Sequence, residues 1–275
     1  MVAKPPETVT QQIAVILGVS GSGQPLLNIL RPLLGRDTGI ELHGVFIKDD
    51  ELQQAAALPF VKELCRLTLS VRDIHDTRFD RTIALRLRTA RNAVEELARR
   101  MGVSHTFRTA QGSTLSLLRE TVHSANITVF EPLRKFAAPA TGQTLHTRLK
   151  DRRIVVVIDD VVTGDEALLT AALLAKGQSD RITILLRAKN AVELDAMDHM
   201  IRELLPTRPT RLLLLPDRGI QHLVDSVYAE RADMLVIGAS EEMLKPESLG
   251  SLLKQIECPI CLVRQIDGMA KEPVA

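Results

Sequence analysis

The fold is decided by residues 232–264, ADMLVIGASEEMLKPESLGSLLKQIECPICLVR. Its first apolar run predicts a buried strand over 233–238, and its last predicts a strand over 259–264. Between them, leucines at helical spacing predict a helix over 245–256. A strand, a crossover helix and a second strand form the repeating unit of a parallel sheet that is covered on both faces.

The same alternation extends through the second half of the chain. It predicts strands over 153–158, 181–187 and 210–215, and helices over 165–176, 190–204 and 219–231. Thr163 and Glu166 have the spacing of a capping box at the start of the helix 165–176. Regular alternation of strands and helices predicts an α/β protein.

The first half shows the same alternation with one long interruption. It predicts strands over 12–18, 40–47, 104–110 and 126–130, and helices over 24–35, 81–101 and 113–124. Residues 48–80 insert a long segment, in which LPFVKELC (58–65) predicts a helical turn or two. A short helix is expected near 143–150. The first half therefore has four predicted strands of its own.

An internal repeat relates the two halves. The segment that begins at Gly112 aligns without a gap to the one that begins at Gly219, an offset of 219 − 112 = 107. The strands that begin at Ile13 and Ile154 also correspond, each leading through a polar turn into a helix. We therefore expect two tandem domains, 1–150 and 151–275, and the sequence leaves open whether the strand 153–158 serves both.

Composition limits the class of protein. The chain has 275 residues, 45% of them hydrophobic and 25% charged, and a formal net charge of +1. Near-neutral charge and only 3% aromatic residues argue against a nucleic-acid partner. No apolar run approaches the ~18 residues of a membrane helix, and the amino-terminal residues do not have the pattern of a signal peptide. The sequence thus predicts a cytoplasmic protein without a membrane partner.

Three segments resemble the universal stress protein family. Residues 232–264 resemble that family's closing strand, phosphate loop, helix and final strand, and residues 152–175 resemble its opening strand and helix. Residues 41–52 are similar to its second strand and the start of the connection after that strand. The resemblance implies two tandem Rossmann-like domains, of the adenine nucleotide alpha hydrolase-like type, each with a five-stranded parallel sheet flanked by helices. It also implies a nucleotide site in those members that bind ATP.

In ATP-binding members the phosphate loop is Gly-x-x-Gly, nine residues, then Gly-Ser/Thr. Gly238 matches the first glycine, and Ser240 lies in the same loop. Glu241 occupies the second glycine and adds negative charge where phosphate would lie. Counting on places Ser251 at the third glycine, and Gly250–Ser251 supplies the required pair one residue early.

The first half departs further from this motif. At the offset of 107, Glu131 falls on Gly238 and Pro132 falls on Ala239. A carboxylate and a residue without an N–H group are poor ligands for phosphate. Glu131, Pro132 and Glu241 together make ATP a disfavoured cofactor.

Two further places are candidate ligand contacts. The turn GVSGSGQ (18–24) contains Gly21 and Gly23, whose amides could hold an anion, although a flexible turn with a helix cap is the alternative. Asp159 and Asp160 end the strand 153–158, where open α/β sheets bind ligands. The resemblance places Asp159 near the base or ribose of a nucleotide, and the alternatives are a divalent cation or solvated turn carboxylates.

The remaining reactive residues favour no catalytic class. Cys258 and Cys261 form a CxxC pattern that enters a strand rather than a helix, so we expect buried, inert thiols. No second Cys or His pair has the spacing of a zinc site, and no catalytic site or metal site is predicted.

Three functional hypotheses remain open. The first is a non-catalytic stress-response regulatory or binding protein with a protein partner. Its halves would pack as a pseudo-dimer or pair through an exposed final strand 259–264, and a homodimer is possible in principle. The second is an ATP-binding protein or slow ATPase that uses the second half. The third is a small-ligand sensor with the insert 48–80 as a lid.

Overall fold

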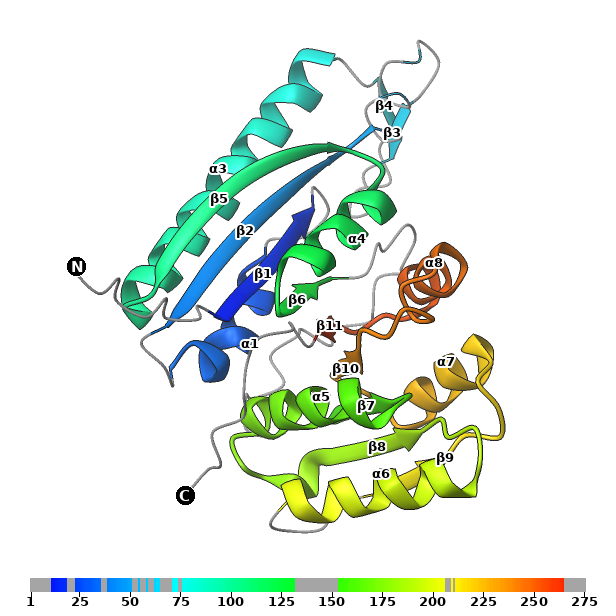
Figure 1. Cartoon of the computed structure of the whole chain (residues 1–275). Helices are drawn as coiled ribbons and strands as arrows, with labels where there is room; N and C mark the ends of the chain where they lie inside the picture. Colours follow the sequence, from blue (N-terminus) through cyan, green and yellow to red (C-terminus); the bar gives the residue numbers. More distant parts are fainter. Residues whose placement is uncertain are drawn as a thin grey trace, which may run out of the picture.

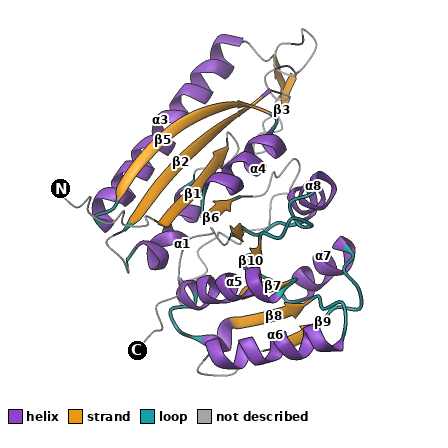
Figure 2. Cartoon of the chain, viewed as in Figure 1, coloured by secondary structure: helices purple, strands orange, loops and turns teal. Residues whose placement is uncertain are grey.

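The computed structural model describes residues 11–18, 23–35, 39–50, 54, 58, 62–64, 71–73, 76–131, 153–205, 209 and 211–264. These residues form a mixed, mostly parallel sheet of nine strands flanked by helices (Figures 1 and 2). The α/β class expected from the sequence is therefore confirmed. No helix within the described ranges combines the length and the apolarity needed to cross a membrane.

The elements follow one another as the sequence predicts, with small shifts at their ends. The strands of the large sheet are β1 (Gln11–Gly18), β2 (Ile40–Asp49), β5 (Ser104–Gly112), β6 (Ile127–Phe130), β7 (Ile154–Ile158), β8 (Ile182–Leu186), β9 (Arg211–Leu214), β10 (Met234–Gly238) and β11 (Ile260–Val263). The helices are α1 (Gln24–Leu34), α3 (Asp76–Met101), α4 (Thr114–Ser124), α5 (Val161–Leu174), α6 (Ala191–Leu204), α7 (Ile220–Ala229) and α8 (Pro246–Gln255).

The strand order is β5-β2-β1-β6-β11-β10-β7-β8-β9. Within each half all neighbouring strands are parallel, and the first strand of the half lies inside the sheet with the second strand on one side. The halves meet where β6 and β11 pair antiparallel, with Val129 opposite Cys261. This arrangement is that of two doubly wound sheets joined edge to edge.

The junction settles three expectations. Pairing of the halves through the final strand is confirmed, but the expected exposure of that strand is wrong, because β11 is hydrogen-bonded to β10 on one side and β6 on the other. β7 lies between β10 and β8, so it belongs to the second half alone. Among the described residues the first half contributes four strands to the large sheet, as expected. The expected boundary at residue 150 lies outside the described residues.

The insert departs from its prediction. Lys62–Leu64 form strand β3, which pairs antiparallel with β4 (Val71–Asp73), so the helical turn expected there is wrong. A strand partner nearby outweighs the weak local preference of so short a segment for helix. α3 also begins at Asp76 rather than at residue 81. The helix expected near 143–150 lies outside the described residues.

Two apolar layers fill the space between sheet and helices. One layer contains side chains of α1, α3, α5 and α6, and the other those of α4, α7 and α8. The central strands carry buried residues toward both layers, which explains their continuous apolar sequences. Figure 1 shows α3 running along β5 at one end of the sheet and α6 along β8 at the other.

The structure shows that the two repeats align only with a gap between the helix and the strand. Ile127 and Met234 begin equivalent strands at an offset of 234 − 127 = 107. The buried faces of the preceding helices correspond instead at 105, since Leu118 matches Leu223 (223 − 118 = 105) and both are buried. The connection from helix to strand is thus longer in the second half, a difference that an ungapped alignment hides.

Candidate ligand site at the carboxyl edge of the second half

The candidate site lies where the winding of the second half changes direction. β7 and β10 are neighbours, and the chain leaves them toward helices on opposite faces of the sheet. Asp159 directly follows β7, and Ser240 follows β10. Open α/β sheets bind ligands at this place, outside the carboxyl ends of the strands. The structure therefore brings together two of the residues that the sequence singled out.

Asp159 forms a buried ion pair in which one nitrogen of Arg187 contacts both carboxylate oxygens. Nη1 of Arg187, which directly follows β8, donates to both carboxylate oxygens of Asp159 at 2.8 and 3.0 Å. Both side chains are only 4% exposed. Burial makes such a pair hard to dismantle, because either charge alone would remain without a partner in a poorly solvated place. The alternative of solvated turn carboxylates is therefore wrong for Asp159.

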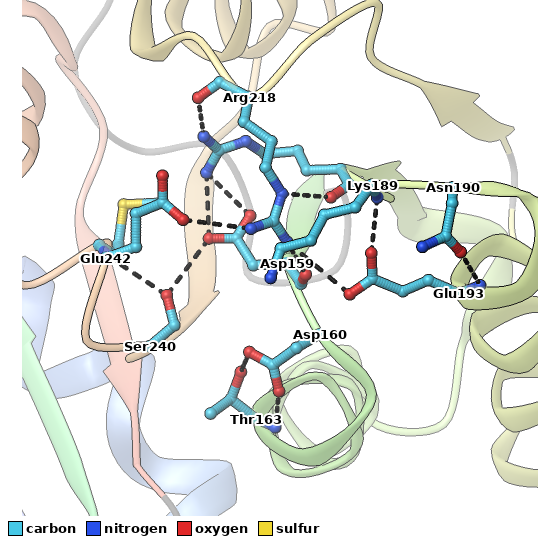
Figure 3. Close-up of polar contacts among 11 residues, drawn as sticks. Asp159, Asp160, Thr163, Lys189, Asn190, Glu193, Arg218, Ser240 and Glu242 are labelled. Atoms are coloured by element: carbon cyan, nitrogen blue, oxygen red, sulfur yellow. Dashed lines mark hydrogen bonds and ion pairs between the residues drawn. The ribbon is translucent and has the colours of Figure 1, made fainter.

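A second arginine closes the cluster from the surface. Arg218 Nε donates to the carbonyl of Arg187 at 2.9 Å, and Arg187 Nη2 donates in turn to the carbonyl of Arg218. Arg218 also donates to the carbonyl of Asp159 and, through Nη1, to Glu242 at 3.1 Å. Ser240 Oγ donates to Asp159 at 3.4 Å (Figure 3). The crevice is thus occupied by side chains of the protein itself.

Burial outweighs the favourable contacts in setting the pKa of Asp159. Burial raises the pKa of Asp159, and the guanidinium groups of Arg187 and Arg218 together with the Ser240 hydroxyl oppose that rise. Nε of Arg187 is buried and has no hydrogen-bond partner among the described residues. One strong donor of the cluster is therefore left over after the internal contacts are made.

Sequence reasoning missed both arginines. Arg187 lies 28 residues beyond Asp159, and Arg218 lies 59 residues beyond it. The only local signal is a charged residue directly after the apolar strand ITILL, at the edge where ligands bind.

Asp160 has a structural role in α5. It is the N-cap residue, and its carboxylate accepts from the backbone N–H of Thr163 at 2.9 Å and from the Thr163 hydroxyl at 2.7 Å. The expected capping box of Thr163 and Glu166 is wrong, because Asp160 is the better cap and starts the helix at Val161.

Gly238 is required by packing. A Cβ atom at this position would lie 2.6 Å from Oγ1 of Thr163 and 2.8 Å from its carbonyl oxygen. The first turn of α5 therefore rests directly on the end of β10, and the glycine that matches the phosphate loop has a sufficient structural explanation.

The other residues of the expected loop are arranged differently. Gly250 and Ser251 lie within α8, beyond its first four residues, so their N–H groups belong to the helical ladder. Ser240 is engaged through its hydroxyl, which also accepts from the N–H of Met243 at 3.3 Å. Glu241 is exposed. Among the described residues, no hydrogen bond joins Gly250 or Ser251 to the Asp159 cluster.

The corresponding edge of the first half is only partly described. Gly23 is the N-cap of α1 and has a left-handed backbone, φ 69°, and a Cβ there would lie 2.8 Å from Leu17. Glu131 directly follows β6, as expected. Gly21 and Pro132 lie outside the described residues.

Cys258 and Cys261 are free thiols, not a disulfide. Cys261 is fully buried, and burial raises its pKa, while that of Cys258 rises to about 12 for the same reason. Both are therefore protonated at neutral pH; the predicted burial is confirmed for Cys261, whereas Cys258 is only partly buried. Across the described ranges, no three His, Cys, Asp or Glu side chains are grouped so as to hold a metal ion.

Comparison with known proteins gives a limited result. No family model and no curated protein sequence matches the chain. The structure is similar, at 12% identity and a TM-score of 0.48, to a universal stress protein from Archaeoglobus fulgidus, over 93% of this chain and 97% of that one. It is also similar, at 11% identity and a TM-score of 0.41, to a protein of unknown function from Pseudomonas aeruginosa, over 93% and 92% of the two chains. Similarities this weak carry no argument about function.

Proposed function

We propose that this chain is a tandem protein of the universal stress protein type, with domains at 1–150 and 151–275, that acts by binding a partner rather than by catalysis. The sequence resemblance of residues 232–264 motivates the family. The observation that carries the functional proposal is the ion-pair cluster of Asp159, Arg187 and Arg218, which fills the crevice where a nucleotide would enter.

The cluster favours a closed site for a physical reason. A nucleotide base or ribose that approached Asp159 would have to displace Arg187, which is 4% exposed and held by two charged hydrogen bonds. Removing one partner of a buried pair costs about 3–5 kcal/mol. The binding free energy of the ligand would be weakened by that amount.

The test is thermal unfolding of the full chain with and without millimolar Mg-ATP, followed by mass analysis of small molecules that co-purify. We expect no shift of the Tm and no retained nucleotide. A ligand at about 100 times its Kd would stabilise the fold by roughly 2.7 kcal/mol, so binding of ordinary affinity would be visible. A clear shift would overturn the closed-site proposal.

A second candidate, nucleotide binding in the second half, is favoured by one observation. Nε of Arg187 is buried without a hydrogen-bond partner among the described residues, so an anionic group could be received there if Arg218 moved aside. In that case Arg187→Gln would abolish the ATP-dependent shift, because it removes the nitrogen that receives the anionic group. Glu242→Gln, which removes only the exposed partner of Arg218, would preserve or enlarge it.

The regulatory role is tested in the source organism. We expect a strain that lacks the protein to survive starvation, heat or oxidative stress less well, and expect the wild-type chain to restore survival. Equal survival of both strains under all three conditions would contradict a stress-response function.

A further inference from the structure

A hollow of the first half lies far from the Asp159 cluster. It has a volume of about 270 Å³ and opens between α4 and strands β1, β2 and β5. Figure 1 shows α4 lying over the sheet beside β1. At about 30 Å³ per water molecule, the volume suits a ligand of about nine non-hydrogen atoms. Among the described residues, none that lines the cavity comes from the insert 48–80.

The rim of the cavity carries two opposite charges. Nη1 of Arg108 on β5 lies 3.1 Å from Oε1 of Glu120 on α4, and both side chains are at least half exposed. An exposed pair of this kind contributes little to stability. The pair holds the two charges on opposite sides of the opening. Replacing their mutual contact by contacts with a charged ligand would therefore cost little stability.

His43 forms part of the cavity wall. Its Nδ1 is hydrogen-bonded to the Thr106 hydroxyl at 2.6 Å. Its Nε2 is buried and has no hydrogen-bond partner among the described residues, and the carboxylate of Glu41 lies at 3.4 Å without the alignment of a hydrogen bond. This nitrogen has almost no solvent-accessible surface, so His43 contributes to the wall of the cavity as a residue held by Thr106 and Glu41.

The second half has different residues at the positions equivalent to two cavity residues. The strand registers make Ala14 equivalent to Val155, since Ile13 and Ile154 begin the matching ladders. By the same registers Arg108 is equivalent to Leu213. Val155 and Leu213 belong to the apolar layer beneath α7. The first half has a small residue and a charged residue where its own repeat has larger apolar side chains.

We propose that this cavity binds a small zwitterion of the α-amino-acid class. Such a molecule carries an ammonium and a carboxylate close together, so both can face the Arg108–Glu120 pair with opposite charges opposed. The guanidinium of Arg108 would hold the carboxylate, and Glu120 would hold the ammonium. Ala14, only 1% exposed, provides the small floor against which the carbon atoms lie.

The test is thermal unfolding and calorimetric titration of the full chain with each standard L-amino acid at millimolar concentration. A simple alkylamine and a simple alkylcarboxylate serve as probes that carry one charge only. We expect at least one amino acid to raise the Tm saturably, and expect neither single-charge probe to match it. Arg108→Gln and Glu120→Gln should each weaken binding about ten- to hundredfold, because each removes a charged hydrogen bond.

Two variants make the result specific to the cavity. Ala14→Val copies the residue of the second half, so it should fill the floor and abolish binding while the unliganded protein keeps its Tm. Glu96→Gln is the matched control, because Glu96 forms a surface ion pair with Arg100 at 2.6 Å on α3, outside the cavity; it should bind as the wild type does. The proposal is overturned if no amino acid stabilises the chain, or if Ala14→Val and Arg108→Gln both bind as the wild type does.

Discussion

Arg187 and Arg218 each donate a hydrogen bond to the backbone carbonyl of the other. This exchange ties the end of β8 to the turn that precedes α7, and it fixes both guanidinium groups around Asp159. The carboxyl edge of the second half is thereby held together by its own side chains, and loss of any member of the cluster should be measurable as lost stability.

The Asp159–Arg187 pair should behave as one unit. Asp159→Ala leaves the Arg187 charge buried without its partner, so we expect a loss of about 3–5 kcal/mol in the free energy of unfolding. Asp159→Leu combined with Arg187→Met should cost clearly less than the sum of the two single changes. Denaturant unfolding of the wild type, Asp159→Leu, Arg187→Met and the double variant measures the coupling between the two residues. Additive losses of unfolding free energy would contradict it.

The two glycines of the expected phosphate loop should respond in opposite ways. Gly238→Ala forces a contact with the carbonyl oxygen of Thr163, 2.8 Å from the new Cβ, so we expect about 1–3 kcal/mol of destabilisation. Gly250→Ala meets only Leu115 at 4.0 Å and lies inside α8, so it should stabilise the fold by about 0.5–1 kcal/mol. Chemical denaturation checks both values, and a stabilising Gly238→Ala would refute the packing explanation.

The thiols of Cys258, which is partly buried, and Cys261, which is fully buried, should make the fold sensitive to alkali. The pKa of Cys258 rises from 9.0 to about 12 in the folded chain, and burial also raises that of Cys261. Above pH 9 the unfolded state loses these protons while the folded state keeps them, so the folded state binds more protons and stability falls as pH rises. The expected slope is about 1.4 kcal/mol per pH unit for each thiol.

This prediction is checked by unfolding in urea between neutral pH and pH 10. The stability contributed by the thiols should be constant below their unfolded pKa. The double variant Cys258→Ala, Cys261→Ala should have a lower starting stability and a shallower alkaline slope. An unchanged slope would mean that the thiols are not the source.

The halves should unfold together. The chain contains one tyrosine, Tyr228 on α7, and no tryptophan, so intrinsic fluorescence reports on the second half alone. Leu30→Ala creates a cavity in α1 of the first half, where Leu30 is fully buried, and should cost about 2–5 kcal/mol. We expect the Tyr228 transition to move by the same amount as the far-ultraviolet circular dichroism transition. Separate transitions would show two independent folding units.

Structural features that depend on neighbouring residues in the sequence were predictable, whereas features that depend on residues far apart in the sequence were not. Central strands such as β7 (IVVVI), β10 (MLVIG) and β11 (ICLV) were predictable because each is a continuous apolar run bounded by polar turns. The cap Asp160 was misassigned because two candidate caps lie three residues apart, and the choice depends on where β7 ends. The pairing of Val129 with Cys261 has no local signal at all.

The candidate site likewise contains one residue that a local pattern predicts and two that it does not. Asp159 was identified because acids at the end of a strand follow a general rule of α/β sheets. Its partners Arg187 and Arg218 come from later connections, and only the assembled sheet brings them together. The cavity below Arg108 and Glu120 was not predicted, because it arises from Ala14 on one strand and charges on two other elements.

The antiparallel contact between β6 and β11 has a consequence for how the halves could diverge. In a symmetric pair of identical subunits, every substitution at the interface appears twice, once on each subunit. Here Val129 faces Cys261, two different residues in one chain, so each side can change alone. Substitutions on the two sides of this junction can therefore accumulate independently.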